Sequence, residues 1–201
     1  YWRSASAART LFAEGADALI ARLNKLDAWF FSAISLASMS RAQRDTLLSA
    51  ARDCRRAGGV VAFDSNYRPS LCESKHAAQE TVMRAWSVAD IALPPVDDEM
   101  ALFGDADEAA VAARLQRAGV TFGAMKRGAR GPRPIGWEIA DGAFAPAEIV
   151  IDTAAAGDSF NGGFLAGIFT GAAPADAAIA GHALASKVIA HKGAIIPPER
   201  M

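Results

Sequence analysis

The chain has 201 residues, of which 52% are apolar and 21% are charged, and its formal net charge is −1. This length supports one substantial hydrophobic core and predicts a single domain over residues 1–201. The near-neutral charge with scattered Lys and Arg argues against a nucleic-acid partner, and without a run of eighteen apolar residues we expect no membrane-spanning segment.

The cysteine content indicates the cellular compartment. Cys54 and Cys72 are too few for the disulfide framework of a small secreted protein, and no group of His and Cys has the spacing of metal ligands. We therefore expect a cytoplasmic protein without a resident metal centre of that kind. The first residue is Tyr1 rather than Met, and no charged-then-apolar leader precedes it, which indicates a fragment.

Apolar runs typical of buried strands alternate with periodic segments typical of helices, which predicts an α/β fold with a parallel sheet covered on both faces. Strands are expected over residues 28–36, with an exit loop at the end, and over 60–64, 88–93 and 120–126. Helices are expected between them, over 41–57 with Ser40 as cap and Gly58 as terminator, and over 75–87, 97–103 and 107–118.

The last third of the chain is interrupted by Pro and Gly over residues 132–148, where we expect a pair of strands. Residues 149–151, Ile-Val-Ile, predict the buried end of a strand. A helix is expected over 157–169, because Phe160, Phe164 and Ile168 fall on one face at four-residue spacing, and a final helix over 174–190.

Ligands of an open parallel sheet collect at the carboxyl ends of its strands. Four predicted loops fall at those ends, over residues 65–71, 94–98, 127–131 and 153–158. These loops are the candidate binding segments.

The loop over residues 153–158 carries the strongest chemical signal. Ala154, Ala155, Ala156 and Gly157 have no polar side chains and precede a helix, so unpaired N–H groups and the helix dipole favour a phosphate there. Asp158, in the first helical turn, can take a proton from an attacking hydroxyl. The alternative is that Asp158 only caps the helix, but four polar residues bracket the loop where a cap needs one.

Two other loops carry charged groups suited to anions. Asn66 and Arg68 follow the strand 60–64, and the Arg guanidinium suits a carboxylate or a phosphate. A second basic loop follows the strand 120–126 and consists of Lys126, Arg127, Gly128, Ala129, Arg130 and Gly131. For both loops the alternative is simple exposure to solvent.

The segment 152–160, Asp-Thr-Ala-Ala-Ala-Gly-Asp-Ser-Phe, closely resembles the second signature of the ribokinase-like (PfkB) sugar kinase family. The resemblance implies that Asp158 is the catalytic base and that Ala155, Ala156 and Gly157 form the anion hole. Ala155 stands where the family has Gly, so a positive φ would be costly at this position. The Ala-Ala-Gly-Asp version is similar to that of the 2-keto-3-deoxygluconate kinase branch.

Other segments resemble the same branch. Residues 64–69, Asp-Ser-Asn-Tyr-Arg-Pro, imply that Asn66 and Arg68 lie at the sugar acid and the nucleotide phosphates. The basic loop Lys126–Gly131 is similar to the loop that lines the ATP site, and Tyr1, Trp2 and Arg3 resemble a segment that contacts the sugar acid. Asp98 takes the place of a Glu that organises magnesium, but Pro95 replaces the accompanying Asn, so a helix N-terminal acidic cluster is an equal interpretation.

The resemblance implies a three-layer α/β/α ribokinase-like fold with a mainly parallel sheet, of which this chain is the C-terminal two thirds, without the N-terminal strands and the β lid. It implies ATP-dependent phosphorylation of the terminal hydroxyl of 2-keto-3-deoxygluconate, with Mg²⁺ held by few protein ligands and a homo-oligomer in the intact protein. The alternatives are a related kinase for fructose, ribose or a nucleoside, and a non-catalytic sugar or nucleotide binder.

Overall fold

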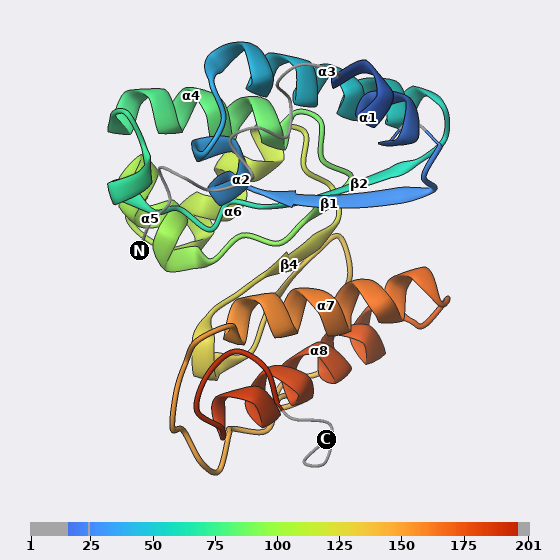
Figure 1. Ribbon diagram of the computed structural model, residues 1–201. Coiled ribbons are helices and arrows are strands. Elements are labelled where there is room, and N and C mark those ends of the chain that lie inside the picture. The colour runs from blue at the N-terminus through green and yellow to red at the C-terminus, as the bar shows by residue number, and fades with distance from the viewer. Residues whose placement is uncertain (1–15, 24, 197–201) are drawn as a thin grey trace. The chain divides into compact units, whose positions relative to one another are not determined.

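The computed structural model describes residues 16–23 and 25–196 and divides the chain into two compact units, residues 1–123 and 124–201 (Figure 1). The expected single domain over residues 1–201 stays a prediction. Among the described residues, no helix combines the length and the apolar character needed to cross a bilayer.

A five-stranded sheet has the order β1-β2-β3-β4-β5. Its strands are β1 (Ala28–Ser32), β2 (Val60–Asp64), β3 (Ile91–Ala92), β4 (Gly123–Met125) and β5 (Arg133–Ile135). The pairs β1–β2, β2–β3 and β3–β4 are parallel, with Trp29 opposite Val61, Ala62 opposite Ile91 and Ala92 opposite Gly123. This arrangement confirms the predicted mainly parallel sheet, and β4 contains the boundary between the two units.

Helices of the first unit connect its strands. They are α1 (Ala16–Leu23), α2 (Ala33–Ala37), α3 (Arg41–Arg56), the 3-10 turn η3 (Pro69–Leu71), α4 (Lys75–Trp86), α5 (Val96–Phe103) and α6 (Glu108–Arg117). In Figure 1, α1, α3 and α4 lie along one face of β1 and β2. Ser40 caps α3 as predicted, because its Oγ accepts from the Gln43 amide (3.3 Å) and Gln43 Oε1 accepts from the Ser40 amide (2.8 Å).

The core of the first unit forms where β2 meets these helices. Val61, Ala62 and Phe63 are fully buried. The Phe63 ring lies 4.9 Å from that of Phe31 and 4.6 Å from that of Trp86, measured between centroids. Consecutive buried residues are typical of a strand in a parallel sheet that is covered on both faces. The packing of β2 in this core holds in place the loop that follows it.

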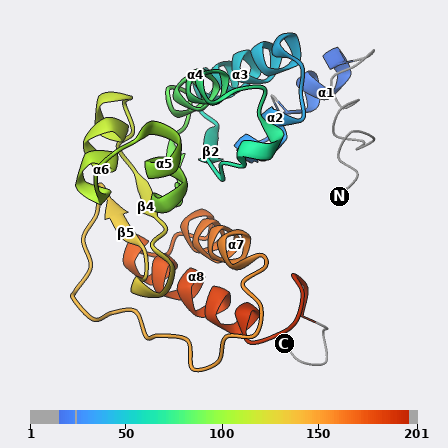
Figure 2. The ribbon, with the colours of Figure 1, turned by 90° about the vertical axis from the view of Figure 1, so that its left-hand side faces the viewer.

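The second unit is built on two packed helices, α7 (Ala156–Phe169) and α8 (Pro174–Ile189), which lie side by side in Figures 1 and 2. Glycines permit the close approach: a Cβ on Gly163 would lie 2.7 Å from the Gly181 Cα, and one on Gly181 would lie 2.8 Å from the Phe160 carbonyl oxygen. The unit also contains the 3-10 turn η4 (Gly128–Arg130). The packing of α7 against α8 fixes the N-terminus of α7, where the candidate site lies.

Several expected strands differ from the structure. Residues 149–151 form no strand, and the three side chains are 58–61% exposed, so the predicted buried strand end is wrong. Of these three residues, only Ile151 makes a backbone hydrogen bond, from its amide to the carbonyl oxygen of Ile189 (2.8 Å). No strand among the described residues pairs with this triplet. Within 132–148 the structure has β5 but no second strand, and β1 ends at Ser32 because α2 begins there.

Candidate active site

The loop before α7 is anchored by Asp152. Its Oδ1 accepts from the Ala154 amide and its Oδ2 from the Gly193 amide, each at 2.9 Å. These two N–H donors hold the pKa of the Asp152 carboxyl below its usual range. Asp152 therefore ties the loop to the segment that follows α8 and keeps one geometry at the start of α7.

Open amides surround the first turn of α7. The Ala156 amide donates to the Thr153 carbonyl oxygen (3.2 Å), and the Ser159 amide makes the first helical bond, to the Ala155 carbonyl oxygen (2.8 Å). In the part of the chain that the structure describes, the amides of Ala155, Gly157 and Asp158 have no acceptor. These three donors, at the positive end of the helix dipole, can receive an anion.

Asp158 lies beside these amides. Its side chain is exposed, and within residues 16–23 and 25–196 it has no hydrogen-bond or ion-pair partner. The helix dipole favours an acidic residue in this first turn without a direct bond to an amide. The Asp158 carboxylate is therefore open to accept a proton from a ligand bound at the amides.

Ala155 adopts a left-handed conformation at the start of α7, with φ of 61° and ψ of 11°. It is the only residue other than Gly with positive φ among those described. The sequence suggested that Ala could adopt this conformation only at a cost, and the structure places it there. This conformation is strained for a residue with a Cβ, so it stores strain at the candidate site.

We predict that Ala155→Gly raises the free energy of unfolding by about 0.5–1 kcal/mol, because Gly adopts positive φ without a Cβ clash. The matched control is Ala156→Gly one residue later, in helical conformation, which should lower the same quantity by about 0.5–1 kcal/mol. Chemical denaturation of the three proteins measures both effects. A loss of stability in Ala155→Gly would contradict the inference that the backbone of Ala155 is strained.

Lys126 follows β4 and reaches α7. Its Nζ donates to Asn161 Oδ1 at 3.1 Å, and a Cβ added to Gly157 would lie 3.6 Å from the same Nζ. The Lys126 ammonium therefore lies over the first turn of α7, next to the open amides. Asn161 is 2% exposed and was missed by the sequence analysis, although a polar residue on the buried face of an apolar helix was a usable signal.

The rest of the basic loop folds back on itself. Arg127 Nε donates to the Gly131 carbonyl oxygen (3.0 Å), while Gly128, Ala129 and Arg130 are exposed. Gly131 has φ of 71°, and a Cβ there would lie 2.4 Å from the Phe144 ring, so only Gly permits this contact. The loop thus supports the segment that contains Phe144.

A groove of about 410 Å³ lies between that segment and α8. The Phe144 ring lies 5.3 Å from the His182 ring, and His182 Nε2 is 2.8 Å from the Ala145 carbonyl oxygen. The remaining lining is mostly small or apolar and includes Ala143, Pro146, Ile149, Ile179, Ala183 and Ala190.

The first unit contains the other predicted polar loop, after β2. Asp64 Oδ1 accepts from the Asn66 amide (2.9 Å), which forms an Asx turn. Arg68, with a half-exposed side chain, bonds through NH1 to Asp98 Oδ2 (3.1 Å) and to the Tyr67 carbonyl oxygen (2.8 Å). The two residues singled out from separate loops, Arg68 and Asp98, therefore form an ion pair.

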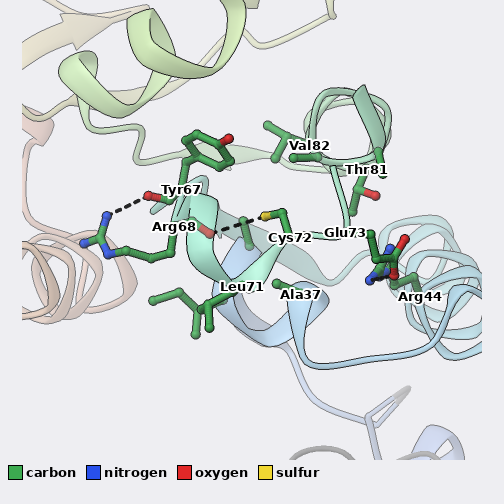
Figure 3. A pocket seen from close by; sticks show the side chains of 13 residues that line it. Ala37, Arg44, Tyr67, Arg68, Leu71, Cys72, Glu73, Thr81 and Val82 are labelled. Carbon is green, nitrogen blue, oxygen red and sulfur yellow. Dashed lines mark hydrogen bonds and ion pairs between the residues drawn. The ribbon is translucent and has the colours of Figure 1, made fainter. Parts of the chain in front are cut away.

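A small pocket lies beside this loop (Figure 3). It is lined by Tyr67, Leu71, Cys72 and Val82, and Arg44 closes it by pairing with Glu73 (2.7 Å). Its volume of about 20 Å³ holds little more than one water molecule. Burial raises the pKa of the Cys72 thiol, which argues against a reactive cysteine.

A buried ion-pair cluster lies beneath the same loop. Glu99, at 0% exposure, accepts from Arg114 at 2.7 Å, and Arg114 also bonds to Asp105 (2.6 Å). Burial raises the pKa of the Glu99 carboxyl, while the Ser65 hydroxyl and the Arg114 guanidinium oppose the rise. No sequence pattern marks this cluster, which holds α5 against α6.

The structure groups the predicted site residues by unit. Lys126–Gly131 and Ala155–Asp158 belong to the second unit, whereas Asn66, Arg68 and Asp98 belong to the first. Tyr1, Trp2 and Arg3 lie outside the described residues. The described residues contain no group of three His, Cys, Asp or Glu side chains placed to hold a metal ion.

Comparison with known proteins adds to this geometry. Residues 2–201 match the family described as pfkB family carbohydrate kinase. The chain is 44% identical to the 2-dehydro-3-deoxygluconokinase of Escherichia coli, over 100% of this chain and 67% of that protein, and 40% identical to that of Dickeya dadantii, over 100% and 66%. It thus spans about two thirds of the length of these relatives.

Solved structures show the same fold. Aminoimidazole riboside kinase from Salmonella enterica, complexed with aminoimidazole riboside and an ATP analog, superposes with a TM-score of 0.72 at 27% identity. The match covers 83% of this chain and 57% of that one. Fructokinase from Vibrio cholerae, in its fructose, ADP and calcium ion bound form, gives a TM-score of 0.73 at 23% identity. That match covers 83% of this chain and 56% of the fructokinase chain.

Proposed function

The chain belongs to the pfkB family of carbohydrate kinases, and we propose that the intact protein transfers the γ-phosphate of ATP to the terminal hydroxyl of 2-keto-3-deoxygluconate. The observation that carries the proposal is the start of α7, where the exposed Asp158 carboxylate lies beside open amides. The identity of 40–44% to two 2-dehydro-3-deoxygluconokinases over the whole chain supports the choice of sugar acid, since 2-dehydro and 2-keto name the same compound.

The proposed reaction is an in-line displacement. The hydroxyl oxygen forms a bond to the γ-phosphorus while the bond from that phosphorus to the β–γ bridging oxygen breaks, and ADP leaves with the electron pair. Asp158 accepts the hydroxyl proton. The amides of Ala155 and Gly157 stabilise the charge on the transferring group, because they are fixed before the reaction begins.

We propose that the nucleotide occupies the second unit. The groove between the Phe144 segment and α8 has the apolar lining and the few polar groups, such as His182, that suit a flat aromatic base. Lys126 and the basic loop to Gly131 lie on the same unit and provide positive charge for phosphates. Asn66 is a further proposed nucleotide contact that rests on the sequence alone. Mg²⁺ would enter on the nucleotide and keep most of its waters.

We propose that Arg68 binds the carboxylate of the sugar acid. Its guanidinium is half exposed and already pairs with a carboxylate, that of Asp98, so it can bind a second one on its open side. Tyr1, Trp2 and Arg3 are further proposed contacts that rest on the sequence alone.

Arg68→Ala is therefore expected to raise KM for 2-keto-3-deoxygluconate by about 10–100-fold, the loss of one charge-assisted bond pair. The KM for a neutral sugar that the protein accepts should change by less than about twofold. Initial-rate kinetics with both sugars checks this expectation. Equal changes for both sugars would contradict carboxylate recognition by Arg68.

A side-by-side substrate panel tests the proposed function. Purified intact protein is given ATP with 2-keto-3-deoxygluconate, fructose, ribose and a nucleoside, and ADP release is followed. We expect kcat/KM to be highest for the sugar acid. A preference for a neutral sugar would favour the related kinases, and nucleotide binding without any transfer would favour a non-catalytic binder. The cytoplasmic location and the homo-oligomer stay predictions.

A further inference from the structure

Arg68 and Asp98 belong to the same unit, and their contact uses only one nitrogen of the guanidinium. Nη1 donates to Asp98 Oδ2 at 3.1 Å and lies 3.4 Å from Oδ1. The same Nη1 donates to the Tyr67 carbonyl oxygen at 2.8 Å, the bond drawn from Arg68 in Figure 3. Because Nη1 carries two hydrogens, the carboxylate and the carbonyl together occupy it fully.

The other donors of Arg68 remain open. In the part of the chain that the structure describes, Nε and Nη2 make no hydrogen bond, and the side chain is 48% exposed. The Nε hydrogen and one Nη2 hydrogen point in parallel from one edge of the guanidinium, which matches the two oxygens of a carboxylate. The contacts of Nη1 thus leave open the edge that can bind a carboxylate through two bonds.

Asp98 is presented by an anchored helix. It lies in the first turn of α5, and its neighbour Glu99 is 0% exposed and accepts from Arg114 at 2.7 Å. Arg68 instead lies in the loop immediately before η3, and its long side chain has many rotamers to choose from. Asp98 is therefore the fixed partner in this contact, and Arg68 is the one that is held.

The contact contributes little to the stability of the fold. An ion pair that is exposed to this degree is screened by solvent, and the entropy lost by a long side chain offsets much of the attraction. A ligand that binds Arg68 would meet the same entropic cost if the side chain were not already ordered. Fixing the guanidinium in advance therefore improves the affinity for a ligand more than it stabilises the protein.

The charge of Asp98 acts in the opposite direction. A carboxylate beside Arg68 weakens the attraction of the guanidinium for a second carboxylate, although solvent screens this effect as well. Asp98 does not occupy the Nε–Nη2 edge, so it does not compete for the donors that a ligand needs. Ordering by Asp98 and competition by Asp98 predict opposite changes in ligand affinity when its side chain is removed.

We propose that Asp98 is a positioning residue that holds Arg68 through Nη1, together with the Tyr67 carbonyl oxygen, so that the Nε–Nη2 edge faces the carboxylate of the sugar acid. This inference rests on the proposed function, in which Arg68 binds that carboxylate, and adds to it a role for Asp98 in sugar binding. Asp98 does not contact the sugar and acts only through Arg68.

The test measures the Kd of the intact protein for 2-keto-3-deoxygluconate by calorimetry without nucleotide or Mg²⁺, so it does not depend on phosphoryl transfer. The wild type is compared with Asp98→Ala, Asp98→Asn, Arg68→Ala and the double variant of the two alanine substitutions. We expect Asp98→Ala to raise Kd about three- to tenfold, because the guanidinium loses one of the two groups that fix it. Asp98→Asn should raise Kd by less than about twofold, since its amide oxygen still accepts from Nη1.

Asp97 offers the matched control. It lies in the same first turn of α5, is exposed, and within residues 16–23 and 25–196 its side chain has no partner. Asp97→Ala removes the same charge from the same helix end, so Kd should stay within about twofold of the wild type. When Arg68 is already Ala, Asp98→Ala should also change Kd by less than about twofold, because Asp98 acts through Arg68.

Several outcomes would overturn the proposal. A lower Kd in Asp98→Ala would show that Asp98 competes with the sugar acid, and additive effects in the double variant would show that it acts independently of Arg68. An equal rise in Asp97→Ala would trace the effect to the charge of the helix end. Should Asp98→Ala fail to fold, Asp98→Ser replaces it, because the shorter side chain cannot reach Nη1.

The variants also separate this inference from the proposed function. No binding by the wild type, or an unchanged Kd in Arg68→Ala, would overturn both the carboxylate contact and the role of Asp98. A raised Kd in Arg68→Ala with an unchanged Kd in Asp98→Ala would overturn the role of Asp98 alone.

Discussion

Replacement of Asp158 by Asn is expected to lower kcat of the intact protein by about 10³-fold, within the roughly 10²–10⁴-fold range for loss of a general base. Asn keeps the shape of the side chain but cannot accept the proton of the sugar hydroxyl. Affinity for ATP should stay equal or rise, since a negative charge beside the phosphate site is removed. Steady-state kinetics and calorimetric nucleotide binding measure the two quantities.

The matched control is Asp176→Asn. Asp176 occupies the first turn of α8 and is exposed, as Asp158 is in α7, so both substitutions remove one favourable interaction with a helix dipole. Both variants should lose about 0.3–1 kcal/mol of unfolding free energy, but only Asp158→Asn should lose activity. Near-normal turnover in Asp158→Asn would reject its assignment as the base.

Arg114→Ala is expected to lower the free energy of unfolding by about 3–5 kcal/mol, the usual effect of removing one partner of a buried ion pair. Arg114 bonds to Glu99 at 2.7 Å and to Asp105 at 2.6 Å, and its Cζ lies 3.7 Å from the centre of the Phe103 ring. Without the guanidinium, the fully buried Glu99 carboxylate would have no counter-charge. Chemical denaturation near neutral pH measures the loss.

The pH dependence of this loss has a definite sign. Burial raises the pKa of Glu99 above its ordinary value, and removal of Arg114 removes a group that opposes the rise. The folded state then favours a protonated Glu99, so the stability of the variant falls as pH rises from the ordinary glutamate range through the raised pKa. The deficit of Arg114→Ala relative to the wild type should therefore shrink as pH is lowered.

The control for Arg114 is Arg56→Ala. Arg56 pairs with Asp53 at 3.0 Å, but both side chains are largely exposed, so the loss should be below about 1 kcal/mol. A similar small loss in Arg114→Ala would show that the buried cluster does not hold α5 against α6.

Sequence patterns predicted the parts of the fold that depend on local chemistry. Ser40 marks the start of α3, and the spacing of Phe160 and Phe164 marks the buried face of α7, because caps and helical periodicity are properties of neighbouring residues. The loop at 153–158 was found for the same reason, since small residues at a helix start have direct consequences for the backbone amides.

The wrong strand prediction over residues 149–151 has a different physical cause. The apolar triplet 149–151 has the composition of a strand, but a strand also needs a partner, and no strand among the described residues pairs with it. Composition cannot show whether a partner exists. The triplet is therefore exposed, and its single backbone bond is to the end of α8.

The side-chain bonds of Asn161 and Glu99 were not predicted because their partners are distant in sequence. The Lys126–Asn161 bond joins residues 35 positions apart, and the Arg114–Glu99 bond joins residues 15 positions apart. Ala155 shows the converse case: the sequence identified the unusual position, and only the backbone revealed that Ala accepts the left-handed conformation there.

The most direct test of the account is a crystal structure of the intact protein with ADP, aluminium fluoride and 2-keto-3-deoxygluconate, in which the fluoride complex mimics the transferring phosphoryl group. We predict that the fluoride ligands accept from the amides of Ala155 and Gly157, and that the Asp158 carboxylate lies about 2.6–3.2 Å from the terminal hydroxyl oxygen of the sugar acid. A fluoride complex bound away from the start of α7, or an Asp158 side chain turned away from that hydroxyl, would contradict the proposed chemistry.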